Sequence, residues 1–192
     1  MPIPTDTYLT SVRKQFAYYK DLAERAMAQV EEADLFWQPD PNSNSIAITV
    51  NHLAGNMRSR WTNFLTADGE KTWRNRDQEF EDIIKTKEEL LLTWEAGWQR
   101  LFAALDSLSE ENIDTQVYIR NQEHAIVEAI NRQLSHYPYH IGQIIYLARL
   151  SAGNQWESLS IPKGGSNSFN QAKFDKGKHR GHFTDDFHEN AK

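Results

Sequence analysis

Two histidines that lie four residues apart are the side chains in this sequence best suited to chemistry. They are His136 and His140, in the run His136-Tyr137-Pro138-Tyr139-His140. If this run is helical, a four-residue step turns by only about 40°, so both imidazoles lie on one face. Imidazoles at this spacing occur in metal sites, but core or surface histidines show it as well. A third ligand must come from elsewhere in the chain.

The residues between the two histidines exclude one use of this spacing. In H-E-x-x-H metalloproteases the general-base glutamate directly follows the first histidine, but this chain has Tyr137 there. The metalloprotease class is therefore excluded. Pro138 costs roughly 3 kcal/mol inside a helix. Its presence leaves two interpretations, a site shaped by the proline or an ordinary bend of the helix.

His52 is the candidate for the third ligand. It lies on the polar side of another predicted helix, opposite an apolar stripe that includes Val50, Leu53, Met57 and Trp61. One interpretation is a solvated surface histidine. In the other interpretation, the polar edges of both helices line one cleft, and small Gly55 and Ser59 let the helices approach. Three imidazoles then hold a metal at the cleft rim, with open coordination positions facing water.

The elements that must position these histidines are amphipathic helices. Apolar residues recur at three- and four-residue steps in four stretches, about 5–31, 46–66, 86–107 and 123–152. Ser and Asn before residue 46 can cap the second helix, and Gly153 ends the fourth. Residues 67–80 show no period and form a connection, whereas 115–120 alternates briefly, as in a short extended piece or hairpin arm.

These elements predict an all-α fold, an up-down four-helix bundle with a short extended piece before the last helix. The bundle spans residues 1–162. The C-terminal tail, 163–192, is expected to be irregular, extended or mobile, because its few apolar groups do not offset the entropy of ordering.

Composition excludes several classes of function. The 192 residues suit one domain, and a net charge of -6 disfavours binding to nucleic acid or an anionic membrane surface. Apolar runs are too short for a membrane span, and the start lacks the pattern of a secretory signal, so a cytoplasmic location is expected. The absence of cysteine excludes disulfides, thiolate ligands and a cysteine nucleophile. Any metal must be held by nitrogen and oxygen.

Two sequence motifs give the chain a family resemblance. With NHLAGN at 51–56 and RQLSHYPYHIGQI at 132–144, roughly residues 5–160 resemble the DinB/YfiT-like superfamily. That resemblance implies a four-helix bundle that carries one divalent metal ion, often nickel or zinc, on His52, His136 and His140. The chain is most similar to an uncharacterised bacterial branch, marked by RSRW at 58–61, DGEK at 68–71 and LSIP at 159–162.

The better understood relatives transfer low-molecular-weight thiols such as bacillithiol onto electrophiles, or use mycothiol to isomerise maleylpyruvate. The resemblance therefore implies a metal-dependent thiol transferase or related hydrolase, with a small-molecule substrate and a low-molecular-weight thiol as cosubstrate. The alternative is a non-enzymatic stress-response protein with a structural metal. Three imidazoles accommodate nickel, zinc, manganese and iron alike, so the sequence does not select the ion. The catalytic residues stay unassigned.

Other polar side chains near the motifs have candidate roles. Gln133 and Gln143 are candidates to buttress the imidazoles through hydrogen bonds, and Asn56 and Tyr139 to hold a substrate. For each, the alternative is an ordinary polar group at a helix contact.

Arginines and tryptophans suggest two further interpretations. An arginine group could clamp the carboxylates of an anionic thiol, but we interpret it as a solvated face without a role in the site. Its members are Arg58, Arg60, Arg74 and Arg76. Six tryptophans exceed what a small core usually absorbs, so a homodimer interface is expected.

Overall fold

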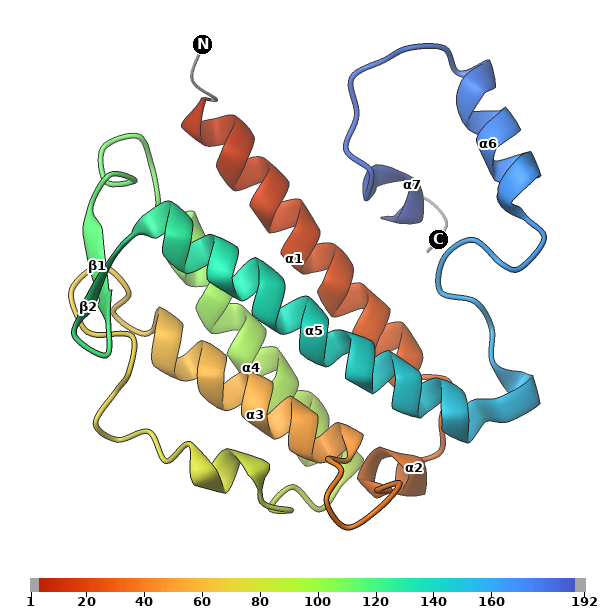
Figure 1. Cartoon of the computed structure of the whole chain (residues 1–192), viewed down its shortest axis with the longest axis horizontal. Coiled ribbons are helices and arrows are strands. Elements are labelled where there is room, and N and C mark those ends of the chain that lie inside the picture. The colour runs from red at the N-terminus through yellow and green to blue at the C-terminus, as the bar shows by residue number, and fades with distance from the viewer. Residues whose placement is uncertain (1–3, 189–192) are drawn as a thin grey trace.

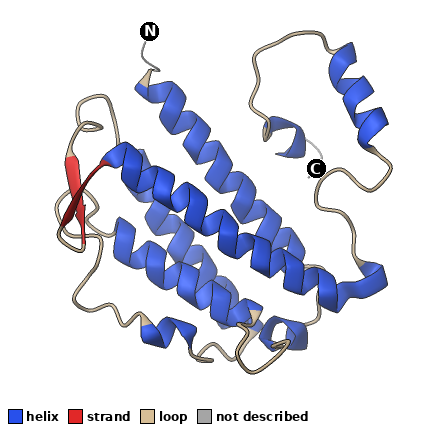
Figure 2. Cartoon of the chain, in the orientation of Figure 1, coloured by secondary structure: helices blue, strands red, loops and turns tan. Residues whose placement is uncertain are grey.

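Four long helices make up most of the computed structural model, which describes residues 4–188 (Figures 1 and 2). They are α1 (Thr5–Met27), α3 (Ile46–Trp61), α4 (Lys87–Asp106) and α5 (Ile126–Ala152). Helix α5 lies between α1 and α3 in Figure 1, and α4 runs behind them and contacts both α3 and α1. The sequence-based expectation of a mainly helical fold is confirmed.

Shorter elements connect and follow these helices. The connections carry helix α2 (Glu32–Phe36), the 3₁₀ helix η1 (Asp77–Phe80) and the antiparallel hairpin of β1 (Gln116–Ile119) and β2 (Gln122–Ala125). The 3₁₀ helix η2 (Gly153–Gln155) follows α5, and α6 (Ser166–Asp175) and α7 (Asp185–His188) lie in the tail. Figure 2 shows this hairpin as the one strand-containing part of the described chain.

Local signals explain where the long helices begin and end. Ser45 caps α3 by accepting a hydrogen bond from the Ile48 N–H at 3.1 Å, and Thr86 caps α4 in the same way from Glu89. Gly153 ends α5 with a φ of 54°, a conformation that glycine adopts without strain. Helix α3 ends five residues before its predicted boundary, because the chain turns extended at Thr62 and reaches a φ of 50° at Asn63.

The core lies between the four long helices and contains the largest aromatic side chains. Trp98 packs edge-on against Phe16 and Tyr137, with ring centroids 6.3 and 6.0 Å apart, and contacts Trp94. All four side chains are fully or almost fully buried. Trp37 and Trp73 are about half exposed. The homodimer that the tryptophans suggested stays a prediction.

The C-terminal tail differs from its prediction. Residues 166–175 form helix α6, and α7 follows, where the sequence indicated an irregular chain. The few apolar groups of the tail contact α1, since Phe183 and Phe187 pack on Tyr18. Asp185 also pairs with Lys14 of α1 at 2.6 Å. Docking on α1 therefore supplies the burial that the tail lacks by itself. Residues 189–192 of the predicted tail lie outside the described residues.

Across residues 4–188, the structure contains no helix that is both long enough and apolar enough to cross a membrane.

Candidate metal centre

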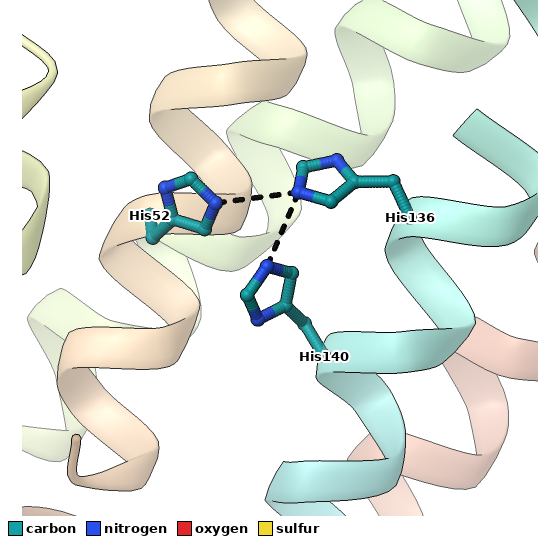
Figure 3. Close-up of side chains that lie close together, drawn as sticks. All are labelled: His52, His136 and His140. Atoms are coloured by element: carbon teal, nitrogen blue, oxygen red, sulfur yellow. Dashed lines mark hydrogen bonds between the residues drawn. The ribbon is translucent and has the colours of Figure 1, made fainter. Parts of the chain in front are cut away.

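Three imidazoles converge at one point between α3 and α5 (Figure 3). His52 comes from α3, and His136 and His140 come from successive turns of α5. The Nε2 atom of His136 lies 3.4 Å from that of His52 and 3.1 Å from that of His140. A tetrahedral zinc ion with Zn–N bonds of about 2.0–2.1 Å would separate its nitrogens by about 3.3 Å. All three ligand nitrogens lie within 4.8 Å of one another, so together they could hold one ion.

The outer nitrogen of each imidazole has its own acceptor. His52 Nδ1 lies 3.0 Å from a carboxylate oxygen of Glu79. His136 Nδ1 lies 3.2 Å from the amide oxygen of Gln133, and His140 Nδ1 lies 3.1 Å from that of Gln143. These oxygens only accept hydrogen bonds, so each Nδ1 must carry the proton that it donates. In the neutral form of each ring, Nε2 then carries a lone pair, and the three Nε2 atoms point to a common centre.

The protonation of the three imidazoles decides whether they suit a metal ion. Three lone pairs in contact repel one another unless a positive charge lies among them. Burial and, to a smaller extent, the charges of His140, His52, Arg60 and Arg132 together lower the pKa of His136 to about 3. Burial also lowers the pKa of His140, although its bond to Gln143 opposes this. His136 and His140 are therefore neutral at pH 7, and neutral imidazole nitrogens are the donors that a divalent cation requires.

Glu79 connects His52 to a buried arginine. Its two carboxylate oxygens accept hydrogen bonds from Arg74 Nε and Nη2, each at 2.7 Å. Burial raises the pKa of Glu79, but the hydrogen bonds and charges of Arg74 and His52 together outweigh it, so this pKa lies below its usual value. The carboxylate is therefore ionised, and it orients the imidazole of His52 as carboxylates orient histidine ligands in metal sites.

Gly55 makes room for this carboxylate. A Cβ at Gly55 would lie 2.5 Å from Glu79 Oε1. The sequence suggested instead that Gly55 and Ser59 let α3 approach the last long helix. Ser59 instead contacts the connection that follows α3, where its hydroxyl donates to the Gly69 carbonyl and accepts from the Lys71 N–H. Both small residues accommodate the connection between α3 and α4.

Phe80 holds His52 from a second side. Its ring stacks on the imidazole with centroids 4.5 Å apart and planes inclined by 26°. The guanidinium group of Arg76 lies over the Phe80 ring, with its central carbon 5.0 Å from the ring centroid. Because η1 carries both Glu79 and Phe80, this one turn supplies a hydrogen bond and an aromatic contact to the same ligand candidate.

A pocket of about 400 Å³ opens beside the three histidines, a volume within the range of small-molecule sites. Besides the histidines, its lining consists of Asn56, Arg60, Arg74, Arg76, Phe80, Arg120, Arg132 and Tyr139. Asn56 is buried, and its side-chain oxygen accepts a hydrogen bond from Tyr137 at 3.1 Å. Tyr139 is largely exposed and packs edge-on against His140. Both residues that were candidates for holding a substrate therefore lie in the pocket wall.

The interpretation of the arginine group as a solvated face is wrong for two of its four members. The side chains of Arg60 and Arg74 are only 6% and 3% exposed. Arg60 donates to the Gly69 carbonyl at 2.5 Å and pairs with Glu70 at 3.2 Å. Arg58 does face outward and lies over the ring of exposed Trp73. Charge runs alone do not reveal this burial, which Glu70 and Glu79 of the following connection compensate by pairing with the two arginines.

One alternative for His52 is wrong as well. His52 is 3% exposed, so it is not a solvated surface histidine. Helix α5 continues through Pro138 from Ile126 to Ala152, so the proline between His136 and His140 does not end the helix. Sequence reasoning missed Glu79 and Phe80, which lie in a segment without periodicity. The available signal was a carboxylate beside an aromatic residue in a connection long enough to reach back to α3.

The fold and the site together define a helical protein with a three-histidine candidate metal centre, and one cluster of this kind occurs among the described residues. Residues 4–165 match the family described as "Protein of unknown function (DUF1572)". The match covers most of the chain, which therefore belongs to this family. Among the curated proteins and the solved structures that were compared, nothing matches the chain.

Proposed function

We propose that this chain is a metal-dependent enzyme that holds one divalent ion on His52, His136 and His140 and acts on a small molecule in the adjoining pocket. The observation that carries the proposal is the convergence of three Nε2 atoms, each on a ring whose Nδ1 has its own acceptor. The resemblance to the DinB/YfiT-like superfamily supports it, and with it a bundle arrangement of the four long helices. Nickel, zinc, manganese and iron(II) are the candidate ions.

The proposed reaction is transfer of a low-molecular-weight thiol to an electrophile, or a related hydrolysis. When bound, a divalent ion lowers the pKa of a thiol or water molecule and so makes a nucleophile at neutral pH. The chain's own contribution is to fix the imidazoles through Glu79, Gln133 and Gln143 and to offer a pocket for the second reactant. Asn56 and Tyr139 are proposed to contact that reactant from the pocket wall.

A conjugation assay tests this proposal. Metal-free protein is loaded with one ion at a time and mixed with a thiol, cysteine or bacillithiol, and the electrophile monobromobimane. At least one ion should accelerate conjugation over the uncatalysed rate. His140→Ala should abolish the acceleration, whereas His179→Ala, which removes an exposed tail histidine outside the cluster, should keep it. Equal rates for the native protein and His140→Ala would remove the thiol-transferase proposal, and an ester hydrolysis assay tests the hydrolase form in the same way.

The alternative, a non-enzymatic stress-response protein with a structural metal, gives a different result. An ion that only ties α3 to α5 would raise the melting temperature without turnover. The pocket beside the histidines favours the enzyme, because a purely structural site has no need of an open wall. Thermal melting of metal-free and metal-loaded protein, run beside the assay, separates the two functions.

A further inference from the structure

We infer that the arginine-lined side of the pocket binds a carboxylate or phosphate group of the substrate, so that the substrate is an anion. This inference deepens the proposed function, on which it rests, because it names the substrate class of the same site. The evidence is the charge of the pocket lining, one unpartnered buried nitrogen and the backbone that holds one of the arginines in place.

The pocket lining is strongly positive although the chain as a whole is negative. Five arginines line the pocket, and its lining contains no Asp or Glu among the described residues. Only two carboxylates pair with these arginines in the described part of the chain, those of Glu70 and Glu79. A surplus of three positive charges remains, in a protein whose net charge is -6. Such a local reversal attracts and orients anions.

Arg60 has an unused donor inside the protein. Its Nη1 donates to the Gly69 carbonyl and to Glu70, but its buried Nε has no hydrogen-bond partner among the described residues. Buried polar atoms are nearly always satisfied, and leaving a charged donor unpaired is costly. Arg60 thus combines an unsatisfied donor with a position in the pocket wall, where an anionic acceptor is the partner that its guanidinium group favours.

Arg120 is held at the pocket by the loop of the β hairpin. It occupies the two-residue turn between β1 and β2 with a φ of 56°, followed by Asn121 with a φ of 60°. The carboxylate of Asp68 holds this turn by accepting the N–H groups of both residues at 2.8 and 2.7 Å. Positive φ at both positions is the usual geometry of a two-residue hairpin loop, and the bonds from Asp68 fix this loop, and with it Arg120, beside the pocket.

Arg132 completes the arrangement from α5. It lies one turn before His136, is exposed, and makes no ion pair with a described carboxylate. Arg120 is also exposed, and its partner Glu70 is shared with Arg60 and Arg74. Guanidinium groups bind carboxylates and phosphates through paired hydrogen bonds. An anionic group held by these arginines would place the rest of the molecule beside the three histidines.

A binding experiment with simple anions tests the inference without requiring turnover. Isothermal titration calorimetry measures succinate, neutral succinamide and inorganic phosphate against metal-free and zinc-loaded full-length protein at low ionic strength. The variant is Arg120→Gln/Arg132→Gln, in which both replaced side chains are exposed, so the fold should persist. The matched control is Arg149→Gln, an exposed arginine near the end of α5 that does not line the pocket.

We expect succinate or phosphate to bind the metal-free native protein and succinamide not to bind. The double variant should weaken anion binding about tenfold or more, the loss expected for charge-assisted hydrogen bonds, and Arg149→Gln should bind as the native protein does. Tighter binding of phosphate than succinate assigns the phosphate class, and the reverse assigns the carboxylate class. Equal anion affinity in the double variant, equal binding of succinamide, or anion binding only with zinc present would overturn the inference.

The outcomes for this inference and for the proposed function are distinguishable. Arginine-dependent anion binding without catalysis by any metal-loaded form supports the anion site and removes the enzymatic proposal. Metal-dependent catalysis with no effect of the double variant on anion binding supports the enzymatic proposal and removes the anion site.

Discussion

His52 is held by two neighbours that follow one another in the sequence. Glu79 accepts a hydrogen bond from its Nδ1, and Phe80 stacks on its ring. Arg74 in turn fixes both oxygens of Glu79. This chain of contacts leaves His52 one orientation, with Nε2 toward His136, and an oriented ligand loses less entropy when it binds an ion.

Replacing Glu79 therefore tests the positioning of His52. Glu79→Gln keeps an oxygen acceptor and nearly the same volume but removes the negative charge that makes the imidazole a stronger donor to a cation. We expect zinc affinity to fall by about 10- to 100-fold, as for other residues that orient metal ligands. A competition titration with a coloured chelator measures this change. Glu81→Gln, an exposed neighbour, is the control, and unchanged affinity in Glu79→Gln would show that Glu79 does not act on the site.

The lowered histidine pKa values predict how the stability of the metal-free protein depends on pH. The pKa of His136 falls from 6.5 to about 3 on folding, and that of His140 is lowered too. Between those pH values the unfolded chain binds more protons than the folded one. Stability should therefore be complete above pH 6.5 and decrease as the pH falls, by up to about 1.4 kcal/mol per pH unit for each proton.

Urea unfolding of chelator-treated protein between pH 5 and 7 measures this slope. Most carboxylates stay ionised in that range, so histidines dominate the change. His136→Gln should give a shallower slope than the native protein. A native slope of zero, or a slope that His136→Gln leaves unchanged, would contradict the burial of a neutral imidazole at this position.

At the scale of elements, the site depends on how closely α3 can lie against its neighbours. Gly97 of α4 faces Ala54 of α3, and a Cβ there would lie 2.9 Å from the Ala54 Cα and 3.2 Å from Met57 Sδ. The contact involves backbone, which cannot rotate away. The absence of a side chain at Gly97 thus sets the distance between these two helices, and Ala54 lies two residues from His52.

An alanine scan of two helical glycines tests this contact. Gly97→Ala should destabilise the protein by about 1–3 kcal/mol, because overpacking exceeds the roughly 1 kcal/mol that alanine gains in helix propensity. Gly142→Ala in α5, where nothing lies within 4 Å of the new Cβ, should instead stabilise it by about 0.5–1 kcal/mol. Denaturant unfolding measures both changes. Equal effects of the two variants would refute the close approach.

The difference between local and distant contacts explains which elements of the fold the sequence could predict. Helical periodicity located all four long helices, and the one-turn spacing of His136 and His140 indicated a shared face. The connection between α3 and α4 gave no such signal. Its residues are fixed by distant partners, as Glu79 is by His52 and Asp68 by the hairpin turn, and these pairings follow from the fold rather than from local propensity. The docked tail was missed for the same reason.

For the molecule as a whole, the candidate site is built from four separate segments. Helices α3 and α5 supply the imidazoles, the connection after α3 supplies Glu79 and Phe80, and the hairpin supplies Arg120. Each segment is positioned by burial in the common core or by hydrogen bonds between segments. Partial unfolding of any one of them should therefore disturb the histidine cluster, which makes metal binding a sensitive report of the intact fold.

Zinc titration of metal-free protein without an affinity tag tests the existence of the metal centre most directly. The account predicts one tightly bound ion per native chain, the same stoichiometry in His179→Ala, and loss of that site in His52→Ala, His136→Ala and His140→Ala, each checked for folding by circular dichroism. A native protein that binds no ion, or folded variants that bind zinc as tightly as the native protein does, would contradict the account.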